Sequence, residues 1–482
     1  MKIVFFFARK AKADSYVPPT GILSLAAVLR EEGFGDIHLF DMAFDEEEAI
    51  LAFCREERPE LIGLSSDTIS FEAGGALLRR IGAECPASRL ILGGVHASIA
   101  PKSALEEAGA ELAVIGEGEV TVVEIVRALV EREELKDIAG TAWLEEGELK
   151  TAALRKPIGN LDVLPLPARD LLPLERYLAT SPDMPMLYPT VTLFVSRGCK
   201  ANCVYCQPVT RTMFGSCMRQ RSVAKVMEEV EYLKAHYSFS NLYFTDDELL
   251  YNGREWVLEL CRALKASRLH WTCQARVDQI DDEIAAALKA SGCYAIGFGV
   301  ESGSKKILQT MRKGYAVERI DEAFAICHRH GIVTTCNLMV GTPGESHETI
   351  DQSVGMLKRV RPDLVRVSIT TPTPGSDLFK RCDEEGRIRV KKLSDFDRWA
   401  ANPIELEGFT QEDIQASIKR LLDVFYSNFF EHFYNPAVFI RKFYFIRLLF
   451  LRYFLLLRNP RRLVRDLSFY LNYFRHRGGR EG

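Results

Sequence analysis

Short apolar runs alternate with longer amphipathic stretches over the first 132 residues. Five runs have the length and composition of buried strands, at residues 2–7, 36–40, 61–66, 89–94 and 112–116. The stretches that separate them repeat apolar residues at helical spacing, at 19–33, 45–56, 72–84 and 103–109. This alternation predicts an α/β domain with a doubly wound, flavodoxin-like sheet, closed by a hairpin at 140–151.

A second alternating series follows a proline-rich segment at 161–177. Its six strand-like runs lie at residues 191–196, 241–246, 271–276, 295–300, 335–340 and 365–370, and helical patterns such as 224–237 and 348–360 follow them. Six βα units predict a partial (β/α)6 barrel with its chemistry at the carboxyl ends of the strands. We therefore expect a first domain at 1–150, a linker at 151–188, the barrel at 189–390 and a helical C-terminal region at 391–482.

The end of the C-terminal region differs in composition from the rest of the chain. From Asn428 onward, eleven Lys and Arg stand against three Asp and Glu, whereas the whole chain has a net charge of −4. Aromatic residues crowd the same segment, and Arg447 and Arg452 interrupt its longest apolar run, which makes it too short to span a membrane. Three interpretations stay open: a helical cap on the barrel, an interfacial membrane helix, or a partner surface.

The overall composition is that of a soluble protein with several domains. The chain has 482 residues, of which 47% are hydrophobic and 27% charged. Its negative net charge disfavours nucleic acid as a partner, and the opening MKIVFFF is too short for a signal peptide, so we expect a cytoplasmic protein. Twelve cysteines in a reducing compartment favour metal binding where they cluster and core packing where they are scattered.

Three of the cysteines lie together directly after the first strand of the second series. Cys199, Cys203 and Cys206 have the spacing C-x3-C-x2-C, with the aromatic Tyr205 before the last. Three thiols cannot all pair as disulfides, and they leave a tetrahedral zinc ion one ligand short. The spacing therefore favours a centre with three protein ligands and one open position. Of the scattered cysteines, Cys217 lies nearest and is the likeliest exception to core packing.

The cysteine motif resembles that of the radical S-adenosylmethionine (SAM) superfamily. The resemblance implies a 4Fe-4S cluster on the three thiols, whose open iron binds SAM and cleaves it to a 5′-deoxyadenosyl radical. Four later motifs also match, namely FTDDELLYN, QARVD, GFGVESGS and NLMVGTPGES. They imply acidic contacts to the SAM amino group, an arginine at its carboxylate, a glutamate at its ribose and a loop along its adenosine. The SAM-binding residues expected from the resemblance are Tyr205, Asp246, Asp247, Arg276, Glu301, Ser302 and Gly341.

Motifs in the first domain resemble the cobalamin-binding domain that precedes many radical SAM barrels. They are PPTGILSLAAVLREEGF, LGGVHAS and VIGEGE. The resemblance implies cobalamin at a sheet edge formed by Ser65, Ser66, Thr68, Gly93, Gly94, His96, Gly116, Glu117 and Gly118. A flavodoxin-like domain with another ligand remains the alternative. The motif D-x-H-x-x-G is incomplete, because Asp41 stands at its glycine after Asp36 and His38, so we expect cobalamin without a histidine lower ligand.

Together the resemblances imply a cobalamin-dependent radical SAM enzyme of the class B methyltransferase type. The main expectation is methylation of an unactivated carbon of a hydrophobic, lipid-like or tetrapyrrole-like substrate, through the 5′-deoxyadenosyl radical and methylcobalamin. The alternatives are a cyclase or rearrangement enzyme of the same build, and a non-catalytic cofactor carrier. A methylthiolating enzyme is disfavoured, because the first domain has only Cys54 and Cys85. The expected partners are a small-molecule substrate, a flavodoxin-type or ferredoxin-type electron donor and, in one interpretation of the C-terminal region, a membrane surface.

Overall fold

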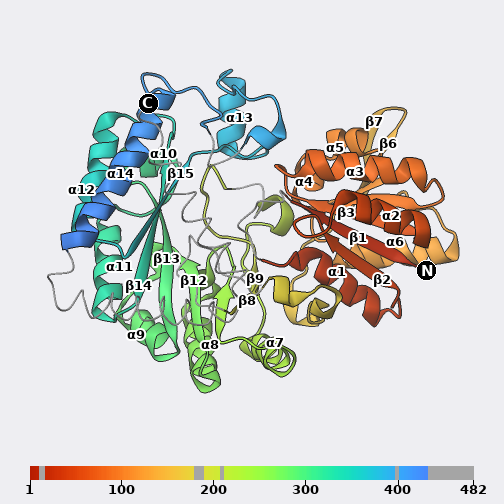
Figure 1. Cartoon of the computed structure of the whole chain (residues 1–482), viewed down its shortest axis with the longest axis horizontal. Helices are drawn as coiled ribbons and strands as arrows, with labels where there is room; N and C mark the ends of the chain where they lie inside the picture. Colours follow the sequence, from red (N-terminus) through yellow and green to blue (C-terminus); the bar gives the residue numbers. More distant parts are fainter. Residues whose placement is uncertain (10–16, 178–188, 207–210, 397–400, 432–482) are drawn as a thin grey trace.

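The computed structural model describes residues 1–9, 17–177, 189–206, 211–396 and 401–431. Two α/β lobes follow each other along the chain and lie side by side (Figure 1). The first lobe holds the N-terminal sheet, and the second holds the sheet of the predicted barrel.

The first lobe is the doubly wound, flavodoxin-like domain that the sequence predicts. Within the described residues its sheet has the order β2-β1-β3-β4-β5-β6-β7, parallel from β1 to β5 and antiparallel in the closing hairpin β6–β7. Apolar side chains from the two faces of this sheet pack into different clusters. The cluster under α1 and α6 continues into the second lobe, and the cluster under α2, α3 and α5 belongs to the first lobe. The elements are β1 (Ile3–Ala8), α1 (Thr20–Glu31), β2 (Ile37–Asp41), α2 (Glu47–Glu57), β3 (Leu61–Ser66), α3 (Phe71–Glu84), β4 (Arg89–Gly93), α4 (Gly94–Ile99), α5 (Pro101–Ala108), β5 (Leu112–Val114), α6 (Glu119–Glu131), β6 (Thr141–Glu145) and β7 (Glu148–Thr151).

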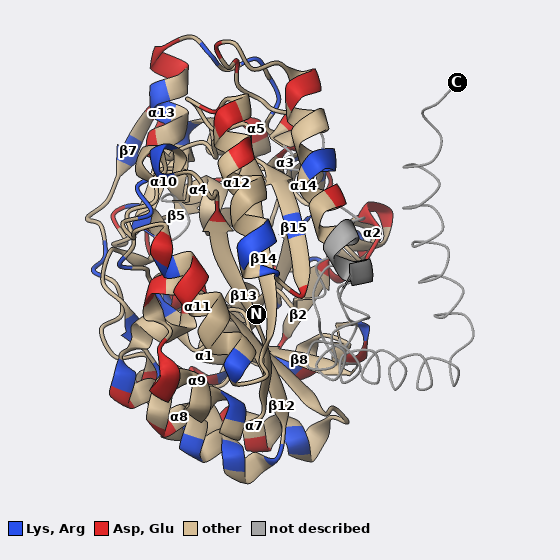
Figure 2. Cartoon of the chain, turned by 90° about the vertical axis from the view of Figure 1, so that its left-hand side faces the viewer, with Lys and Arg blue, Asp and Glu red and all other residues tan. Residues whose placement is uncertain are grey.

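The second lobe is a partial barrel of six parallel strands, as predicted. Its order is β15-β14-β13-β12-β11-β8, with helices between consecutive strands and an additional two-stranded pair, β9–β10, beside the first strand. The elements are β8 (Thr190–Leu193), β9 (Ser196–Arg197), β10 (Arg219–Gln220), α7 (Val223–His236), β11 (Asn241–Phe244), η5 (Leu249–Asn252), α8 (Arg254–Ser267), β12 (His270–Ala275), η6 (Val277–Gln279), α9 (Asp282–Ala290), β13 (Cys293–Glu301), α10 (Lys305–Thr310), α11 (Glu318–Arg329), β14 (Val333–Val340), α12 (His347–Val360) and β15 (Leu364–Ile369). Figure 2 shows charged residues distributed along the outer helices of this lobe.

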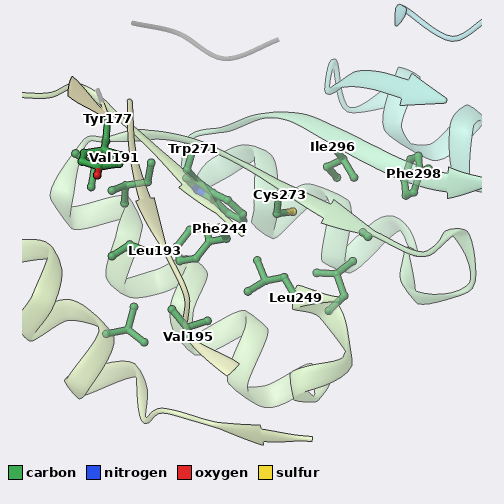
Figure 3. Packing of buried hydrophobic residues seen from close by; sticks show 14 of the residues in the cluster. Tyr177, Val191, Leu193, Val195, Phe244, Leu249, Trp271, Cys273, Ile296 and Phe298 are labelled. Carbon is green, nitrogen blue, oxygen red and sulfur yellow. The ribbon is translucent and has the colours of Figure 1, made fainter. Parts of the chain in front are cut away.

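The two faces of the second sheet differ in polarity. On the helix-covered face, Trp271 is fully buried and packs edge-on against Phe244 with ring centroids 5.3 Å apart (Figure 3). The strand register places Tyr243, Gln274 and Asn337 on the opposite face, where each is half-buried. The Gln274 amide donates to the Tyr243 hydroxyl at 3.4 Å, and Asn337 donates to Gln274 at 3.5 Å. The inner face of the barrel therefore offers polar groups to a ligand.

The proline-rich segment between the lobes is tied to both of them. It contains three short helical turns, η1 (Leu161–Val163), η2 (Arg169–Leu171) and η3 (Leu174–Arg176). The Tyr177 hydroxyl donates to Asp41 of the first lobe at 2.7 Å. The buried Arg169 guanidinium donates to the Glu229 carboxylate and to the Thr192 carbonyl of the second lobe, both at 2.9 Å. This segment therefore holds the two lobes together, and we term residues 161–177 the bracket.

The first part of the predicted helical C-terminal region covers the barrel. It contains η7 (Leu393–Asp395) and α14 (Gln411–Glu431), and α14 packs against α12 and β15 with Ile414 and Leu421 buried. The short helix α13 (Asp377–Glu384) comes before it, within the predicted barrel range 189–390. The basic, aromatic segment from residue 432 onward lies outside the described residues, and its three interpretations stay predictions. Among the described helices, none has the length and apolar character needed to cross a membrane.

Replacement of Glu229 should destabilise the second lobe. Its carboxylate lies between Arg169 and Arg221 with 2% of its side chain exposed, so Glu229→Ala leaves two buried cations without an anionic partner. We expect the free energy of unfolding to fall by about 3–5 kcal/mol, measured by chemical denaturation. The control is Glu231→Ala on the same helix, whose exposed carboxylate pairs with Lys234 and whose loss should cost less than about 1 kcal/mol. Equal losses in the two variants would contradict this reading of the bracket.

Candidate functional site

The loop that carries the three cysteines begins at a buried carboxylate. Asp246, directly after β11, accepts hydrogen bonds from the Val195 and Ser196 backbone N–H groups at 3.1 and 2.6 Å. Gly198 then turns the chain with a φ of +88°, and a Cβ there would lie 2.4 Å from the Cys217 carbonyl oxygen. A glycine is therefore required directly before Cys199. Asp246 serves as the anchor of this loop, and its oxygens are engaged within the protein.

The three cysteines differ in their exposure to solvent. Cys203 is buried, Cys199 is partly buried and Cys206 is exposed. Within the described ranges, no group of three or more His, Cys, Asp or Glu converges as it would on a single metal ion. An iron–sulfur cluster does not require its protein ligands to meet at one metal ion, since each thiolate binds its own iron atom. Three thiols on one loop, with the Arg276 guanidinium 3.9 Å from the Cys203 sulfur, suit such an anionic cluster.

Three side chains, two buried and one half-buried, join the cysteine loop to the end of β13. The Tyr205 hydroxyl donates to Glu301 Oε1 at 3.0 Å, and Lys313 Nζ donates to the same oxygen at 3.2 Å. Glu301 has a backbone φ of +67°, which residues other than glycine rarely adopt. The contacts with Tyr205 and Lys313 help to hold it in this conformation. Lys313 was missed in the sequence, because a lysine beside Arg312 in a polar turn has the pattern of a surface residue. Only its 4% side-chain exposure identifies it as part of the site.

Two acidic residues after Asp246 face the cysteine loop. Asp247 is exposed, yet desolvation by the surrounding protein raises its pKa to about 6. Glu248 is 2% exposed, its Oε1 accepts no hydrogen bond in the described part of the chain, and burial raises its pKa to about 8. Glu248 was not predicted, although a third acid in FTDDEL was a signal for it. The predicted contacts of Asp246 and Asp247 with SAM stay predictions, and Glu248 adds a third carboxylate beside the loop.

The remaining residues predicted to contact SAM lie around the same loop. Arg276 packs against the Tyr251 and Tyr315 rings and is paired with Asp278 by two hydrogen bonds of 3.0 Å. Ser302 is buried and accepts from the Ser304 N–H at 3.1 Å, so it shapes the turn after β13.

Gly341, predicted to lie along the adenosine of SAM, stands in the turn after β14. It has a φ of +94°, and its carbonyl accepts from the Asn402 side chain at 3.0 Å. The roles of Arg276, Ser302 and Gly341 toward SAM stay predictions.

A second ligand edge lies at the carboxyl ends of β3, β4 and β5. Gly94 has a φ of +87°, and a Cβ there would lie 2.8–2.9 Å from the Ser66 backbone and the Ser65 hydroxyl. The Ser66 and Thr68 hydroxyls are buried and have no hydrogen-bond partner among the described residues. Unpartnered hydroxyls beside glycine backbone fit a large, flat ligand with polar substituents, such as cobalamin, better than they fit a packed core.

Ser98 joins the two glycine loops of this edge. Its hydroxyl donates to the Gly94 carbonyl at 2.9 Å and accepts from the Gly116 N–H at 3.0 Å. The predicted cobalamin-binding loops at Gly93–Gly94 and Gly116–Gly118 are thus held as one unit.

The histidines of the first lobe occupy different environments. His38 lies on the surface of β2, bonded to Asp36 at 2.9 Å, while Asp41 is bonded to Arg9 and Tyr177. The incomplete D-x-H-x-x-G motif is therefore structural. His96 is 2% exposed and stacks on Phe71 with ring centroids 4.1 Å apart, and neither of its ring nitrogens has a partner in the described chain. Burial lowers its pKa to about 4, so His96 is neutral at neutral pH.

Glu117, predicted as a cobalamin contact, turns toward the second lobe. Its carboxylate accepts from Arg197 at 3.0 Å, from Arg219 at 2.8 Å and from the Ile158 N–H at 2.6 Å. The neighbouring Gly116 lies close to the Met213 carbonyl: a Cβ built on Gly116 would be 3.7 Å from this oxygen. The glycine edge and the cysteine loop therefore face each other across the domain interface, and the Glu117 side chain is committed to that interface.

The segment after β15 covers the cysteine loop from another side. The Leu378 N–H donates to the Val204 carbonyl at 3.0 Å, and Leu378, Ile404 and Val204 form a small apolar cluster. Farther along, the Ser394 hydroxyl donates to Glu72 of the first lobe at 3.2 Å. This segment spans from one lobe to the other beside the site.

Comparisons with known proteins agree with this geometry. A B12 binding domain model matches residues 8–126, and a radical SAM superfamily model matches residues 193–357. An uncharacterized methyltransferase of Pyrococcus horikoshii is 28% identical over 85% of this chain and 88% of its own length. The anaerobic magnesium-protoporphyrin IX monomethyl ester cyclase of Cereibacter sphaeroides is 25% identical over 80% of this chain and 64% of its own length. The fold is that of the radical SAM methyltransferase TsrM from Kitasatospora setae, with a TM-score of 0.69 and 18% identity over 88% of this chain and 89% of that chain.

Gly94→Ala should weaken cobalamin binding by the first lobe. The added methyl group meets the Ser66 backbone. Position 94 also has a positive φ, which costs about 1–2 kcal/mol in a residue with a side chain. We expect hydroxocobalamin to bind about tenfold more weakly or worse, as measured by spectral titration. The matched control is Gly109→Ala, where φ is +66° but the added Cβ meets open space. If both variants bind like the unmodified protein, the close approach at Gly94 has no part in the ligand edge.

Proposed function

We propose, from the premise that the chain is a radical SAM enzyme with an N-terminal B12-binding domain, that it methylates a carbon atom of a small molecule. This proposal rests on the observation that two ligand-binding edges face each other. The three-thiol loop lies on one side of the domain interface, and the glycine edge of β3–β5 lies on the other. An enzyme that used the cluster alone would have no need of the second edge.

The residues of the second lobe would bind and orient SAM. Cys199, Cys203 and Cys206 would hold the cluster, and Asp247 with Glu248 would accept hydrogen bonds from the SAM amino group. Glu301, oriented by Tyr205 and Lys313, would accept from the ribose hydroxyls. When bound, the cluster and SAM supply a carbon radical, and cobalamin supplies the methyl group.

The first lobe would hold cobalamin at the glycine edge. Ser65, Ser66 and Thr68 would offer hydroxyls to its polar substituents, and Gly93 and Gly94 would allow its approach to the backbone. The environment of His38 supports binding without a histidine lower ligand, since this residue is engaged with Asp36 on the surface.

The segment at residues 377–396 and 401–406 would limit the access of water to the reacting atoms. It packs on the cysteine loop through Leu378 and reaches the first lobe through Ser394. Exclusion of water protects a carbon radical from side reactions.

The substrate is proposed to combine a hydrophobic body with polar groups. The polar inner face of the barrel, with Tyr243, Gln274 and Asn337, supports hydrogen bonds to part of the substrate. A flavodoxin-type or ferredoxin-type donor would reduce the cluster. Contact with a membrane would depend on the basic, aromatic segment after Asn428.

A second candidate is ring formation without transfer of a methyl group. It is favoured by the resemblance to a magnesium-protoporphyrin ester cyclase, which extends over both lobes of this chain. Both candidates use the same two ligand edges, so the products decide between them.

The two reactions of SAM can be separated by their products. With hydroxocobalamin, SAM and dithionite under anaerobic conditions, we expect both S-adenosylhomocysteine and 5′-deoxyadenosine to accumulate, measured by chromatography. Alanine at Cys199, Cys203 and Cys206 together should abolish 5′-deoxyadenosine, since it removes every thiol that holds the cluster. Cys217→Ala, a change at an exposed cysteine outside the motif, should leave both products unchanged. Formation of 5′-deoxyadenosine with no S-adenosylhomocysteine would favour the cyclase.

A further inference from the structure

We infer that four charged residues at the domain interface set the separation between the two cofactor sites. They form what we term the interface network: Glu117, Glu119, Arg197 and Arg219. The inference rests on the proposed function, because it concerns the distance between the cluster edge and the cobalamin edge. It assigns to these side chains the role of positioning residues, distinct from ligand contacts.

The interface network is compact, buried and balanced in charge. Glu117 accepts from Arg197 at 3.0 Å and from Arg219 at 2.8 and 3.0 Å, and Glu119 pairs with Arg197. The four side chains are only 5–12% exposed. Two carboxylates and two guanidinium groups leave no net charge. Low exposure and fixed geometry make such pairs stiffer than ion pairs on the surface.

Each end of the interface network is attached directly to one ligand edge. Arg197 lies two residues before Cys199, and β9, which carries it, pairs with β10 at Arg219. On the other side Glu117 lies next to Gly116, whose N–H binds Ser98, and Ser98 in turn binds the Gly94 carbonyl. A continuous path of bonds therefore runs from the glycine edge to the cysteine loop.

Ile158, three residues before the bracket, bonds to the same network. The Ile158 N–H donates to Glu117 at 2.6 Å, and Arg219 donates to the Ile158 carbonyl at 2.7 Å. Arg219 also donates to the Phe214 carbonyl at 2.7 Å, and the Phe214 ring lies 5.7 Å below the Arg197 guanidinium. These contacts leave the four side chains little freedom to move relative to either lobe.

This arrangement has a consequence for the proposed reaction. A radical formed on one side of the interface must meet a methyl group held on the other, and small errors of position lower the rate of such a step steeply. Neutralising one member of the network should let the lobes take several separations, while each lobe keeps its own ligand residues. Both cofactors would then bind, but at a less defined distance from each other.

The distance between the cofactors can be measured without substrate. Cobalt(II) cobalamin and the reduced cluster are both paramagnetic, and their dipolar coupling falls with the cube of the distance. Pulsed electron spin resonance on the full chain, reconstituted with iron, sulfide and hydroxocobalamin and then reduced, reports this coupling. We expect one narrow distribution of coupling in the unmodified protein, and its loss in Glu117→Gln and in Arg219→Gln, with both cofactors still bound in full amount.

Two controls separate a positioning role from a general loss of stability. Arg127→Gln removes an exposed ion pair with Glu32 inside the first lobe and should leave the coupling narrow. Glu229→Gln weakens a buried ion pair that involves none of the four residues of the interface network, and it should lower the melting temperature without broadening the coupling. Arg197→Lys keeps the charge but loses the forked donor, so it should broaden the coupling less than Arg197→Gln.

Several outcomes would overturn the inference. Unchanged coupling in Glu117→Gln and Arg219→Gln would show that the interface network does not set the separation. Loss of either cofactor from these variants and from Arg197→Lys would show that the network sustains folding instead. If the unmodified protein bound no cluster or no cobalamin, the proposed function itself would fail, which is a different result from either of these.

Discussion

The carboxylate of Asp246 is the contact on which the rest of the site depends. It binds the two backbone N–H groups at which the cysteine loop leaves β8, and so joins the ends of two neighbouring strands. The turn at Gly198 and the three thiols come directly after this contact in the chain, and their positions depend on it. A buried carboxylate that accepts backbone hydrogen bonds holds a loop in one conformation, because any other conformation would leave its oxygens without partners.

The two ligand edges differ in charge and polarity, and so in the kind of ligand that they suit. Around the cysteine loop, buried acids and bases stand close together: Glu301 with Lys313, and Glu248 near Arg276. Such a site suits a ligand that carries several charges of its own. The edge of β3–β5 instead offers glycine backbone and neutral hydroxyls, with a neutral His96 behind them. That surface suits a bulky ligand held by shape and hydrogen bonds.

Rigid connections between the lobes make these two edges one site. The bracket at residues 161–177 is tied to the first lobe through Tyr177 and to the second through Arg169. Ion pairs around Glu117 add a second connection, and the segment that contains Ser394 adds a third. In the described residues these three connections are polar and directional, and a shared apolar cluster that includes Leu23, Leu174 and Val191 joins the two lobes as well.

Local patterns in the sequence were sufficient for the fold, and they supplied the candidate cysteines and glycines of the site. The alternation of strands and helices predicted both sheets, because hydrophobic periodicity records which face of each element is buried. The cysteine spacing and the glycines of the ligand edge were likewise readable, since each depends on neighbours in the chain. The tertiary structure alone decided the partners of Asp246, the burial of Lys313 and the commitment of Glu117 to the second lobe. It also decided the burial of Glu248, whose Oε1 accepts no hydrogen bond among the described residues. Those properties arise between residues tens of positions apart, and no local pattern records which distant side chain a charged residue will meet.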